Sequence, residues 1–199
     1  MHQPIRRAAA LPLLVLLASL TACSSGTGTR ISADASTPPP TSQSGHSGRS
    51  STPSRVTIES IGVDSALLPL GLNQDGTVEV PPAQQGMTAG WYTGGAVPGE
   101  RGAAVIIGHN DTRFGKAVFH DLRKLHAGAD ISVRNSLGKT AHFTVTATET
   151  VSKKAFPTEK VYGSTDARAL RLVTCDGAFD AQGHPVDNLI VYAELGRGH

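Results

Sequence analysis

Short runs of alternating or continuous apolar residues dominate the chain from residue 55 onward. Val56 and Ile58 alternate with polar neighbours, and residues 103–107, 170–175 and 189–195 are short segments rich in apolar side chains. Alternation with a period of two is typical of a strand with one buried face, and a short continuous apolar run is consistent with a more deeply buried strand. The pattern therefore predicts a series of short β-strands.

Two further patterns complete the predicted domain. Residues 131–133 and 143–147 flank turn-forming residues at 135–138, which predicts a β-hairpin. An amphipathic helix is predicted before Gly128 by apolar residues at a spacing of three and four: Phe114, Ala117, Val118, Leu122 and Leu125. Many strands and one clear helix favour a mainly β, barrel-like domain over a doubly wound α/β sheet.

The amino terminus has the pattern of a bacterial export signal. Arg6 and Arg7 precede the apolar residues 8–20, and Leu20-Thr21-Ala22-Cys23 follows. The apolar stretch is shorter than the roughly 17–25 residues that a membrane-spanning helix needs. A cysteine directly after a Leu-x-Ala box resembles a lipobox, so we expect residues 1–22 to be a lipoprotein signal peptide and Cys23 to be diacylated. Two acyl chains would anchor the protein stably outside the cytoplasm, on the cell membrane. The alternative is an ordinary secretory signal in which Cys23 is incidental.

Composition divides and limits the rest of the chain. Residues 24–54 are almost entirely Ser, Thr, Gly and Pro, so residues 23–54 are predicted to form a lipidated, disordered tether and residues 55–199 the folded domain. The formal net charge is +2, and no basic cluster lies outside the signal region, which argues against a nucleic-acid partner. No cofactor is implied. A metal site is not expected from the spacing of the remaining histidines, which we interpret as structural or solvated: His120, His126, His142 and His184.

A histidine and a cysteine carry the candidate chemistry. His109 follows the apolar run 103–107 and shares a strand face with Val105 and Ile107, while Cys175 ends the segment 170–175. A thiol attacks as its thiolate, and a nearby imidazole can favour that form or protonate a leaving group. If both residues lie at strand ends on one rim of a barrel, they predict covalent catalysis. The alternative is a buried, inert cysteine.

At this point the sequence resembles the sortase family, and in particular the actinobacterial sortases of classes E and F. The resemblance covers residues 55–195, with the histidine before the cysteine. Its motifs are residues 55–64, Gly90-Trp91-Tyr92 with Gly99, Gly108-His109-Asn110-Asp111, Phe119 to Leu125 with Gly128, Leu172-Val173-Thr174-Cys175, and residues 187–193.

The resemblance implies a sortase-like eight-stranded β-barrel, with one or two short helices, and a cysteine transpeptidase for secreted proteins that bear a Leu-Pro-x-Thr-Gly type sorting signal. Cys175 would attack the Thr carbonyl to form a thioacyl enzyme, and His109 would protonate the departing Gly amine. An amine acceptor such as a peptidoglycan precursor would release the product, which anchors the surface protein to the cell wall. Thr174 resembles the family residue that helps to shape the oxyanion environment; the alternative is a β-branched residue that only fills the strand. Asp111 could either orient His109 or cap a loop.

One position departs from the family pattern. The family carries an arginine at the start of its last strand, where this chain reads Pro185-Val186-Asp187-Asn188. The Val186 side chain cannot donate a hydrogen bond, and loss of one oxyanion donor typically costs about 2.7–4 kcal/mol. Arg113 is a possible stand-in. It is favoured over Arg171, which lies four residues before Cys175, or roughly 13 Å along a strand.

Two functions therefore compete. The first is an active sortase-like transpeptidase, and the second is a catalytically weak or inactive sortase-fold lipoprotein that binds a sorting peptide or a wall component. A wall-peptide L,D-transpeptidase is disfavoured, because those enzymes resemble one another in a Ser-His-Gly-Cys motif that this sequence does not contain.

Overall fold

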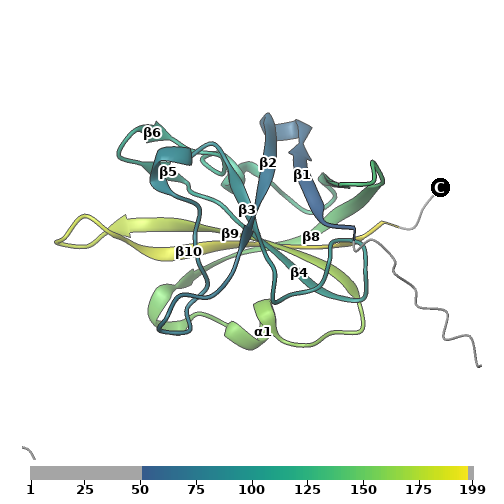
Figure 1. Ribbon diagram of the computed structural model, residues 1–199. Helices are drawn as coiled ribbons and strands as arrows, with labels where there is room; N and C mark the ends of the chain where they lie inside the picture. The colour runs from purple at the N-terminus through teal and green to yellow at the C-terminus, as the bar shows by residue number, and fades with distance from the viewer. Residues whose placement is uncertain (1–50, 197–199) are drawn as a thin grey trace, which may run out of the picture. The chain divides into compact units, whose positions relative to one another are not determined.

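Eight strands close into a barrel, as the computed structural model shows (Figure 1). The structure describes residues 51–196. The order of the strands around the barrel is β1-β2-β3-β4-β9-β10-β8-β7. The bounds are β1 Pro53–Ile58, β2 Val63–Leu70, β3 Ala89–Tyr92, β4 Gly102–Ile107, β7 Asp130–Asn135, β8 Thr140–Ser152, β9 Arg168–Phe179 and β10 Pro185–Leu195. The predicted mainly β fold with an eight-stranded barrel is confirmed.

The amino-terminal predictions lie almost wholly outside the described residues. These are the signal peptide at 1–22, the acylation of Cys23, and all but the last four residues of the tether that was predicted for 23–54. Strand β1 begins at Pro53, slightly before the predicted start of the domain. Within residues 51–196, no helix combines the length and the apolar character that crossing a membrane would require.

The predicted hairpin at residues 131–147 is present as β7 and β8, which pair antiparallel. Asn135 makes the turn: its side-chain Oδ1 accepts hydrogen bonds from the backbone N–H groups of Leu137, at 3.0 Å, and Lys139, at 2.9 Å. Gly138 completes the turn with a φ of 80°, which a glycine adopts without strain. The local turn chemistry thus fixes this register.

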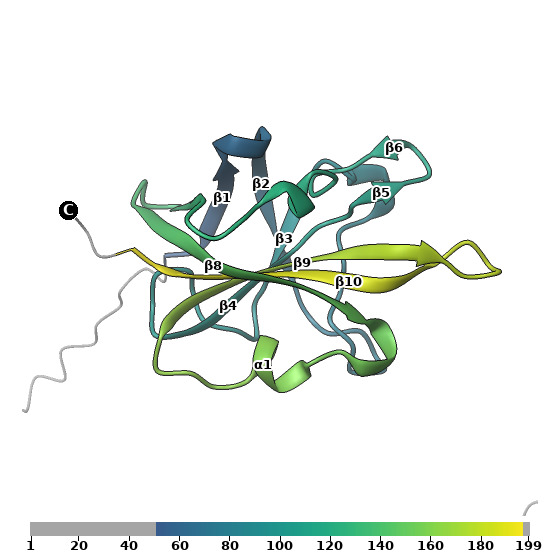
Figure 2. The same ribbon diagram turned by 180° about the vertical axis from the view of Figure 1, so that it is seen from behind.

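Two apolar layers lie on opposite faces of β9. Leu170 and Leu172 point into the barrel interior, where they join the main hydrophobic core. Val173 points outward, into a second apolar cluster that includes Ile190 of β10 and Val161 of the short helix α1 (Thr158–Tyr162). Because β9 is buried on both faces, its sequence is nearly continuously apolar up to Thr174. Helix α1 lies on this outer side of the barrel (Figure 2).

The helix predicted across residues 114–125 is absent, so this prediction was wrong. The segment forms a two-stranded hairpin of β5 (Asp111–Thr112) and β6 (Gly115–Lys116), followed by turns and a 3-10 helix at Leu122–Lys124. Its backbone groups bond to distant partners, since the N–H of Phe119 donates to the carbonyl of His109 at 2.9 Å. Most apolar residues of the predicted helix face are still buried, but Phe114 is 63% exposed. The spacing of the apolar residues therefore predicted burial correctly for most of them, but it predicted the wrong secondary structure.

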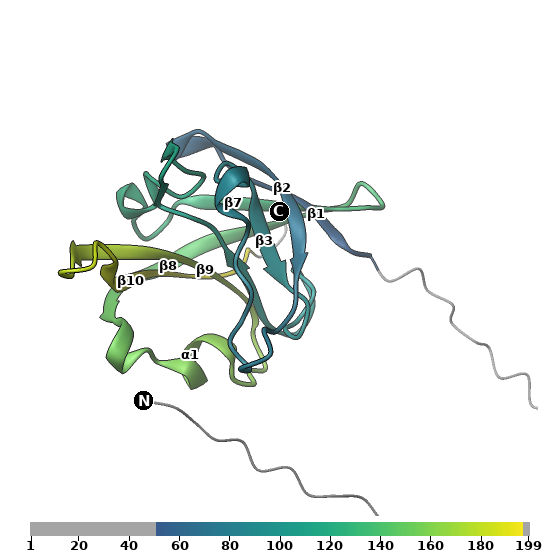
Figure 3. The same ribbon diagram turned by 60° about the vertical axis from the view of Figure 1, so that its left-hand side comes forward.

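The end of β9 also differs from the prediction. Cys175 does not lie at the end of its strand, because β9 continues to Phe179 and pairs with β10 as a long hairpin that projects beyond the barrel (Figure 3). The neighbour on the other side, β4, pairs with β9 only as far as Val173. Cys175 therefore lies where the barrel wall loses one of its two neighbouring strands, which leaves the thiol partly exposed.

Candidate active site

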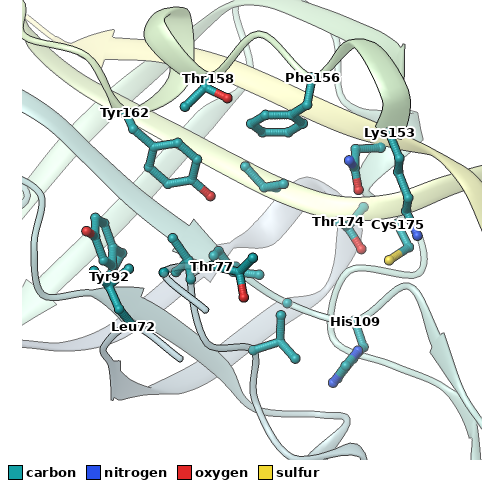
Figure 4. A pocket seen from close by; sticks show the side chains of 17 residues that line it. Leu72, Thr77, Tyr92, His109, Lys153, Phe156, Thr158, Tyr162, Thr174 and Cys175 are labelled. Atoms are coloured by element: carbon teal, nitrogen blue, oxygen red, sulfur yellow. The ribbon is translucent and has the colours of Figure 1, made fainter. Parts of the chain in front are cut away.

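The parallel register of β4 and β9 brings His109 and Cys175 to the same place. Ile107 pairs with Val173, and the N–H of Gly108 donates to the carbonyl of Val173 at 3.1 Å. His109 lies two residues after the end of β4, and Cys175 lies two residues after Val173 in β9. Both line one cavity of about 690 Å³, which we call the first cavity (Figure 4). The two residues that the sequence singled out therefore line the same cavity.

The imidazole of His109 is held by the segment between β2 and β3. Its Nε2 lies 2.6 Å from the backbone carbonyl oxygen of Pro81, which can only accept, so this ring nitrogen donates. No hydrogen bond joins the imidazole to the Cys175 thiol in the described part of the chain. The partly buried histidine is therefore oriented by a backbone group that no sequence pattern pointed to.

Asp111 does not orient His109. Its Oδ1 lies 3.0 Å from Nδ1 of His120. Asp111 begins the small β5–β6 hairpin, and His120 follows the turn after it, so the contact closes this loop. Of the two roles that the sequence left open for Asp111, the geometry fits the loop role.

Thr174 is buried beside Cys175. The residue is only 3% exposed, and its hydroxyl has no hydrogen-bond partner among residues 51–196. Asn110, directly after His109, likewise has a buried side-chain oxygen without a partner. Buried polar atoms are nearly always paired, so these two oxygens beside Cys175 and His109 have capacity for a further hydrogen-bond partner. Figure 4 shows Thr174 adjacent to Cys175 at the edge of the first cavity.

An ion pair fixes the chain on the other side of Cys175. The buried carboxylate of Asp176 pairs with the guanidinium of Arg123 and accepts a hydrogen bond from Thr150 Oγ1 at 3.1 Å. Arg123 belongs to the 3-10 helix at Leu122–Lys124, so the pair ties this loop to β9. No sequence pattern pointed to Arg123 or to Asp176.

The ladder between β9 and β10 places Asn188, rather than Val186, opposite Cys175. The register shifts between Pro185 and Asp187, and Val186 is 37% exposed and borders neither cavity that the thiol reaches. Asn188 lines the first cavity. The position of Asn188 opposite Cys175 follows from the strand register, which the sequence motif alone does not reveal.

The two arginines considered as substitutes for the family arginine both lie away from the first cavity. The Arg113 guanidinium stacks over the Phe114 ring at 4.8 Å from its centre. Arg171 stacks over Tyr192 at 4.9 Å, and burial lowers the pKa of its guanidinium. Neither residue lines the first cavity.

Aromatic side chains form the wall of the first cavity farthest from the thiol. Tyr92 and Tyr162 meet edge to face with ring centres 5.7 Å apart, and Phe156 lies 6.1 Å from Tyr162. Burial raises the pKa of the Tyr162 hydroxyl. Leu72 and Val78, from the segment after β2, also line this cavity, and Figure 4 shows Leu72 beside Tyr92. The cavity can therefore bind an apolar segment that leads to a reacting bond at Cys175.

A second cavity of about 760 Å³ borders Cys175 on the side of β5 and the 3-10 helix. Its lining is rich in charge, but the acidic groups are paired with neighbours. The pairs are Asp111 with His120, Asp121 with Lys124 and Asp176 with Arg123. Among residues 51–196, no group of three or more His, Cys, Asp or Glu side chains is placed to hold a metal ion.

Fold and site together define a class: a closed β-barrel with a free thiol and an imidazole at the mouth of one cavity. The sortase domain family model matches residues 56–196. The chain therefore belongs to the sortase family, whose members are transpeptidases that join proteins bearing a sorting signal to amine acceptors at the cell surface.

Solved structures agree with this assignment at the level of the fold. A lid mutant of sortase A from Corynebacterium diphtheriae is 19% identical with a TM-score of 0.58, over 74% of this chain and 72% of that chain. Sortase C-1 from Actinomyces oris is 22% identical with a TM-score of 0.58, over 73% and 72%. A Clostridium perfringens sortase D5 transpeptidase is 22% identical with a TM-score of 0.54, over 73% and 79%. No match to this chain was found among curated proteins.

Proposed function

We propose that this protein is an active sortase that cleaves a Leu-Pro-x-Thr-Gly type sorting signal between Thr and Gly and transfers the acyl group to an amine. The observation that carries the proposal is the in-register approach of β4 and β9, which places His109 and Cys175 at one cavity. A buried inert cysteine would not line a cavity beside an imidazole. A thiol with a neighbouring base or acid is the arrangement that covalent catalysis needs.

The first half of the reaction uses both residues. The Cys175 thiolate attacks the Thr carbonyl, and the resulting tetrahedral oxyanion collapses as the bond to the Gly nitrogen breaks. His109 gives its proton to that nitrogen, so the amine leaves neutral and a thioacyl enzyme remains. In the second half an incoming amine, such as a peptidoglycan precursor, attacks the thioester and gives a proton back to His109.

Two neighbouring groups assist this chemistry. The unpaired Thr174 hydroxyl lies at the edge of the first cavity, where it can donate toward the substrate. The apolar walls around Tyr92, Phe156 and Tyr162 suit the Leu-Pro part of the signal, because these side chains bury apolar groups without leaving polar atoms unpaired. The Pro81 carbonyl accepts a hydrogen bond from His109 Nε2 and so orients the imidazole.

A peptide assay with a matched histidine control tests the proposal. The full chain is incubated with a fluorogenic Leu-Pro-x-Thr-Gly peptide and triglycine, and adducts on Cys175 are followed by intact mass spectrometry. We expect turnover and a thioacyl adduct, both lost in Cys175→Ala and reduced at least a hundredfold in His109→Asn. His126→Asn, at an exposed histidine away from both cavities, should behave as the wild type. Peptide binding without an adduct would instead identify the inactive, peptide-binding lipoprotein.

We also propose that the protein acts at the outer face of the cell membrane, held by a diacylated Cys23. The support is the Leu-Thr-Ala-Cys box after the apolar stretch. Labelling cells with an alkyne fatty acid should mark the wild type but not Cys23→Ser, which should leave the membrane fraction. A Cys23→Ser variant that is labelled and retained as well as the wild type would contradict this anchor.

A further inference from the structure

The tetrahedral intermediate at Cys175 carries a negative oxygen. The resemblance to the sortase motif places the family arginine at position 186, where this chain has Val186, which borders neither cavity. A buried oxyanion without donors is costly, so a sortase with this sequence needs another source of positive charge or N–H groups. The first cavity supplies two candidates beside the thiol, one from β10 and one from the turn after β8.

We propose that the side chains of Asn188 and Lys153 together stabilise the oxyanion formed when Cys175 is acylated. The proposal rests on the assigned acyl-transfer function of Cys175. It replaces one guanidinium by a neutral amide and a separate ammonium group, which come from two different elements.

Asn188 is the residue directly opposite the nucleophile. It pairs with Cys175 across the antiparallel ladder of β9 and β10, and both residues line the first cavity. Side chains of such a pair project from the same face of the sheet, with Cβ atoms roughly 4.5–5.5 Å apart. The Asn188 amide makes no hydrogen bond to another group in residues 51–196, so its N–H donors are available. An oxygen bonded to the carbon attached to Sγ therefore forms within reach of this amide.

Lys153 lines the same cavity as Asn188. Val151 of β8 pairs with Asn188, and the last pair of that ladder is Ser152 with Asp187. Lys153 follows directly after the end of β8, and its side chain lines the first cavity together with Asn188 and Cys175. The Ser152 hydroxyl accepts from the N–H of Lys154 at 3.3 Å and begins the 3-10 turn Lys153–Ala155. Figure 4 shows the Lys153 side chain reaching down toward Cys175.

The charge of Lys153 is not neutralised by an ion pair within the described residues. The carboxylate of Asp180 feels it from a distance: the pKa of Asp180 is lowered chiefly by a backbone hydrogen bond from His184, and Lys153 contributes least among the causes. Lys153 is also the one lysine or arginine that lines the first cavity. Its exposed ammonium is screened in the free protein, but a bound peptide would cover it and strengthen its effect.

The other cations near the thiol are engaged elsewhere. Arg123 pairs with Asp176, and Lys124 pairs with Asp121 at 3.1 Å. Arg113 stacks on Phe114 and faces the second cavity. The geometry therefore favours Lys153 over Arg113 as the charge that compensates for Val186.

The chemical step is the ordinary acylation. The bond from Sγ to the carbonyl carbon forms while the π electron pair of the carbonyl moves to oxygen, and N–H groups of Asn188 and Lys153 donate to that oxygen. When the pair returns, the bond from carbon to the leaving group breaks. Neither Asn188 nor Lys153 gains or loses a proton.

Two small reagents test this proposal without a sorting signal. p-Nitrophenyl acetate acetylates a thiol through a tetrahedral oxyanion, whereas iodoacetamide alkylates it by direct displacement with no oxyanion. Both rates are measured at Cys175 of the full chain by mass spectrometry of the peptide that contains it. The ratio of acetylation to alkylation reports oxyanion stabilisation even if the sorting-signal proposal fails.

We expect Asn188→Ala and Lys153→Met each to lower this ratio at least fivefold, while Lys153→Arg retains most of it. Lys154→Met is the matched control. Lys154 is the next residue along the chain and its side chain does not line the first cavity, so this substitution should leave the ratio unchanged. Ratios within twofold of the wild type in both Asn188→Ala and Lys153→Met would overturn the proposal. An equal loss of both rates would also overturn it, since it would show a general effect on the thiol.

Discussion

The two cavities that meet at Cys175 differ in how their polar groups are used. In the first cavity, polar side chains near the thiol lack partners within residues 51–196, as for the Thr174 hydroxyl and the Lys153 ammonium, and the remaining walls are apolar and aromatic. In the second, the acidic groups are paired with histidine, lysine or arginine. The second cavity also contains one buried oxygen without a partner in the described residues, that of Asn110, so the contrast between the cavities lies in the paired acidic groups. Under the proposed function, reaction and substrate recognition belong to the first cavity, and structural support of the rim to the second.

The strongest test of this division is the removal of His109, which borders only the first cavity. General acid catalysis contributes about 10²–10⁴ to a rate. His109→Asn should therefore lower the acylation rate of Cys175 by at least a hundredfold. His120→Asn, in the second cavity, should leave that rate within about threefold, because His120 contacts Asp111 rather than the thiol. Stopped-flow measurement of peptide cleavage compares the two, and equal losses would break the division.

Removal of the Asp176 carboxylate should affect stability more than substrate binding. Asp176→Ala loses a charge-assisted contact with Arg123 and a hydrogen bond from Thr150, so we expect the free energy of unfolding to fall by about 1.5–3 kcal/mol. The exposed pair of Arg55 and Asp64 is the control, and Asp64→Ala should cost less than about 1 kcal/mol. Urea denaturation measures both. A stable Asp176→Ala variant with a raised KM for peptide would show that the second cavity binds substrate.

A pair of phenylalanines compares the cavities as binding surfaces. Phe156 lies in the aromatic wall of the first cavity, and Phe179 borders the second with 67% of its surface exposed. Phe156→Ala should raise KM for a Leu-Pro-x-Thr-Gly peptide about tenfold, because an aromatic contact contributes roughly 0.5–1.5 kcal/mol beyond the area it buries. Phe179→Ala should change KM less than twofold. The reverse order would assign the peptide to the second cavity.

The contrast between the cavities also explains what the sequence could predict. Local patterns in the sequence predicted the strands, the β7–β8 hairpin and the candidate pair His109 and Cys175. These patterns are apolar runs, turn residues and short motifs. The failed helix at residues 114–125 shows the limit of such patterns. Its apolar spacing records burial, but backbone bonds to distant residues, such as Phe119 N–H to the His109 carbonyl, decided its conformation.

The groups that the sequence analysis missed depend on contacts between distant segments. Asn188 lies opposite Cys175 only because the ladder of β9 and β10 shifts its register between Pro185 and Asp187. Lys153 reaches the first cavity only because β8 flanks β10 on its other side. The Pro81 carbonyl comes from the segment between β2 and β3. No periodicity within one segment can encode such neighbours. The motif therefore located the two candidate residues, and only the fold shows which groups surround them.

The smallest expected effect concerns how α1, which carries Tyr162 of the first cavity, is held to the barrel. Lys160 of α1 bonds to Glu149 of β8 at 2.5 Å, and Tyr192 donates to the same carboxylate at 3.0 Å. The hydrogen bond from Lys160 is the largest cause of the lowered pKa of Glu149, whose ordinary value is 4.5. A lowered pKa means that the folded state binds the proton less tightly than the unfolded state, so this stabilisation is complete above pH 4.5 and is lost as the pH falls through the folded-state pKa. Glu149 is partly exposed, so solvent screening keeps the effect below about 1 kcal/mol.

Between pH 7 and pH 3, the Glu149→Gln variant should therefore lose slightly less stability in thermal unfolding than the wild type. The Glu159→Gln variant, at the neighbouring exposed carboxylate of α1, should follow the wild type. If Glu149→Gln shows the full acid dependence, the helix is held by the apolar contacts of Val161 alone.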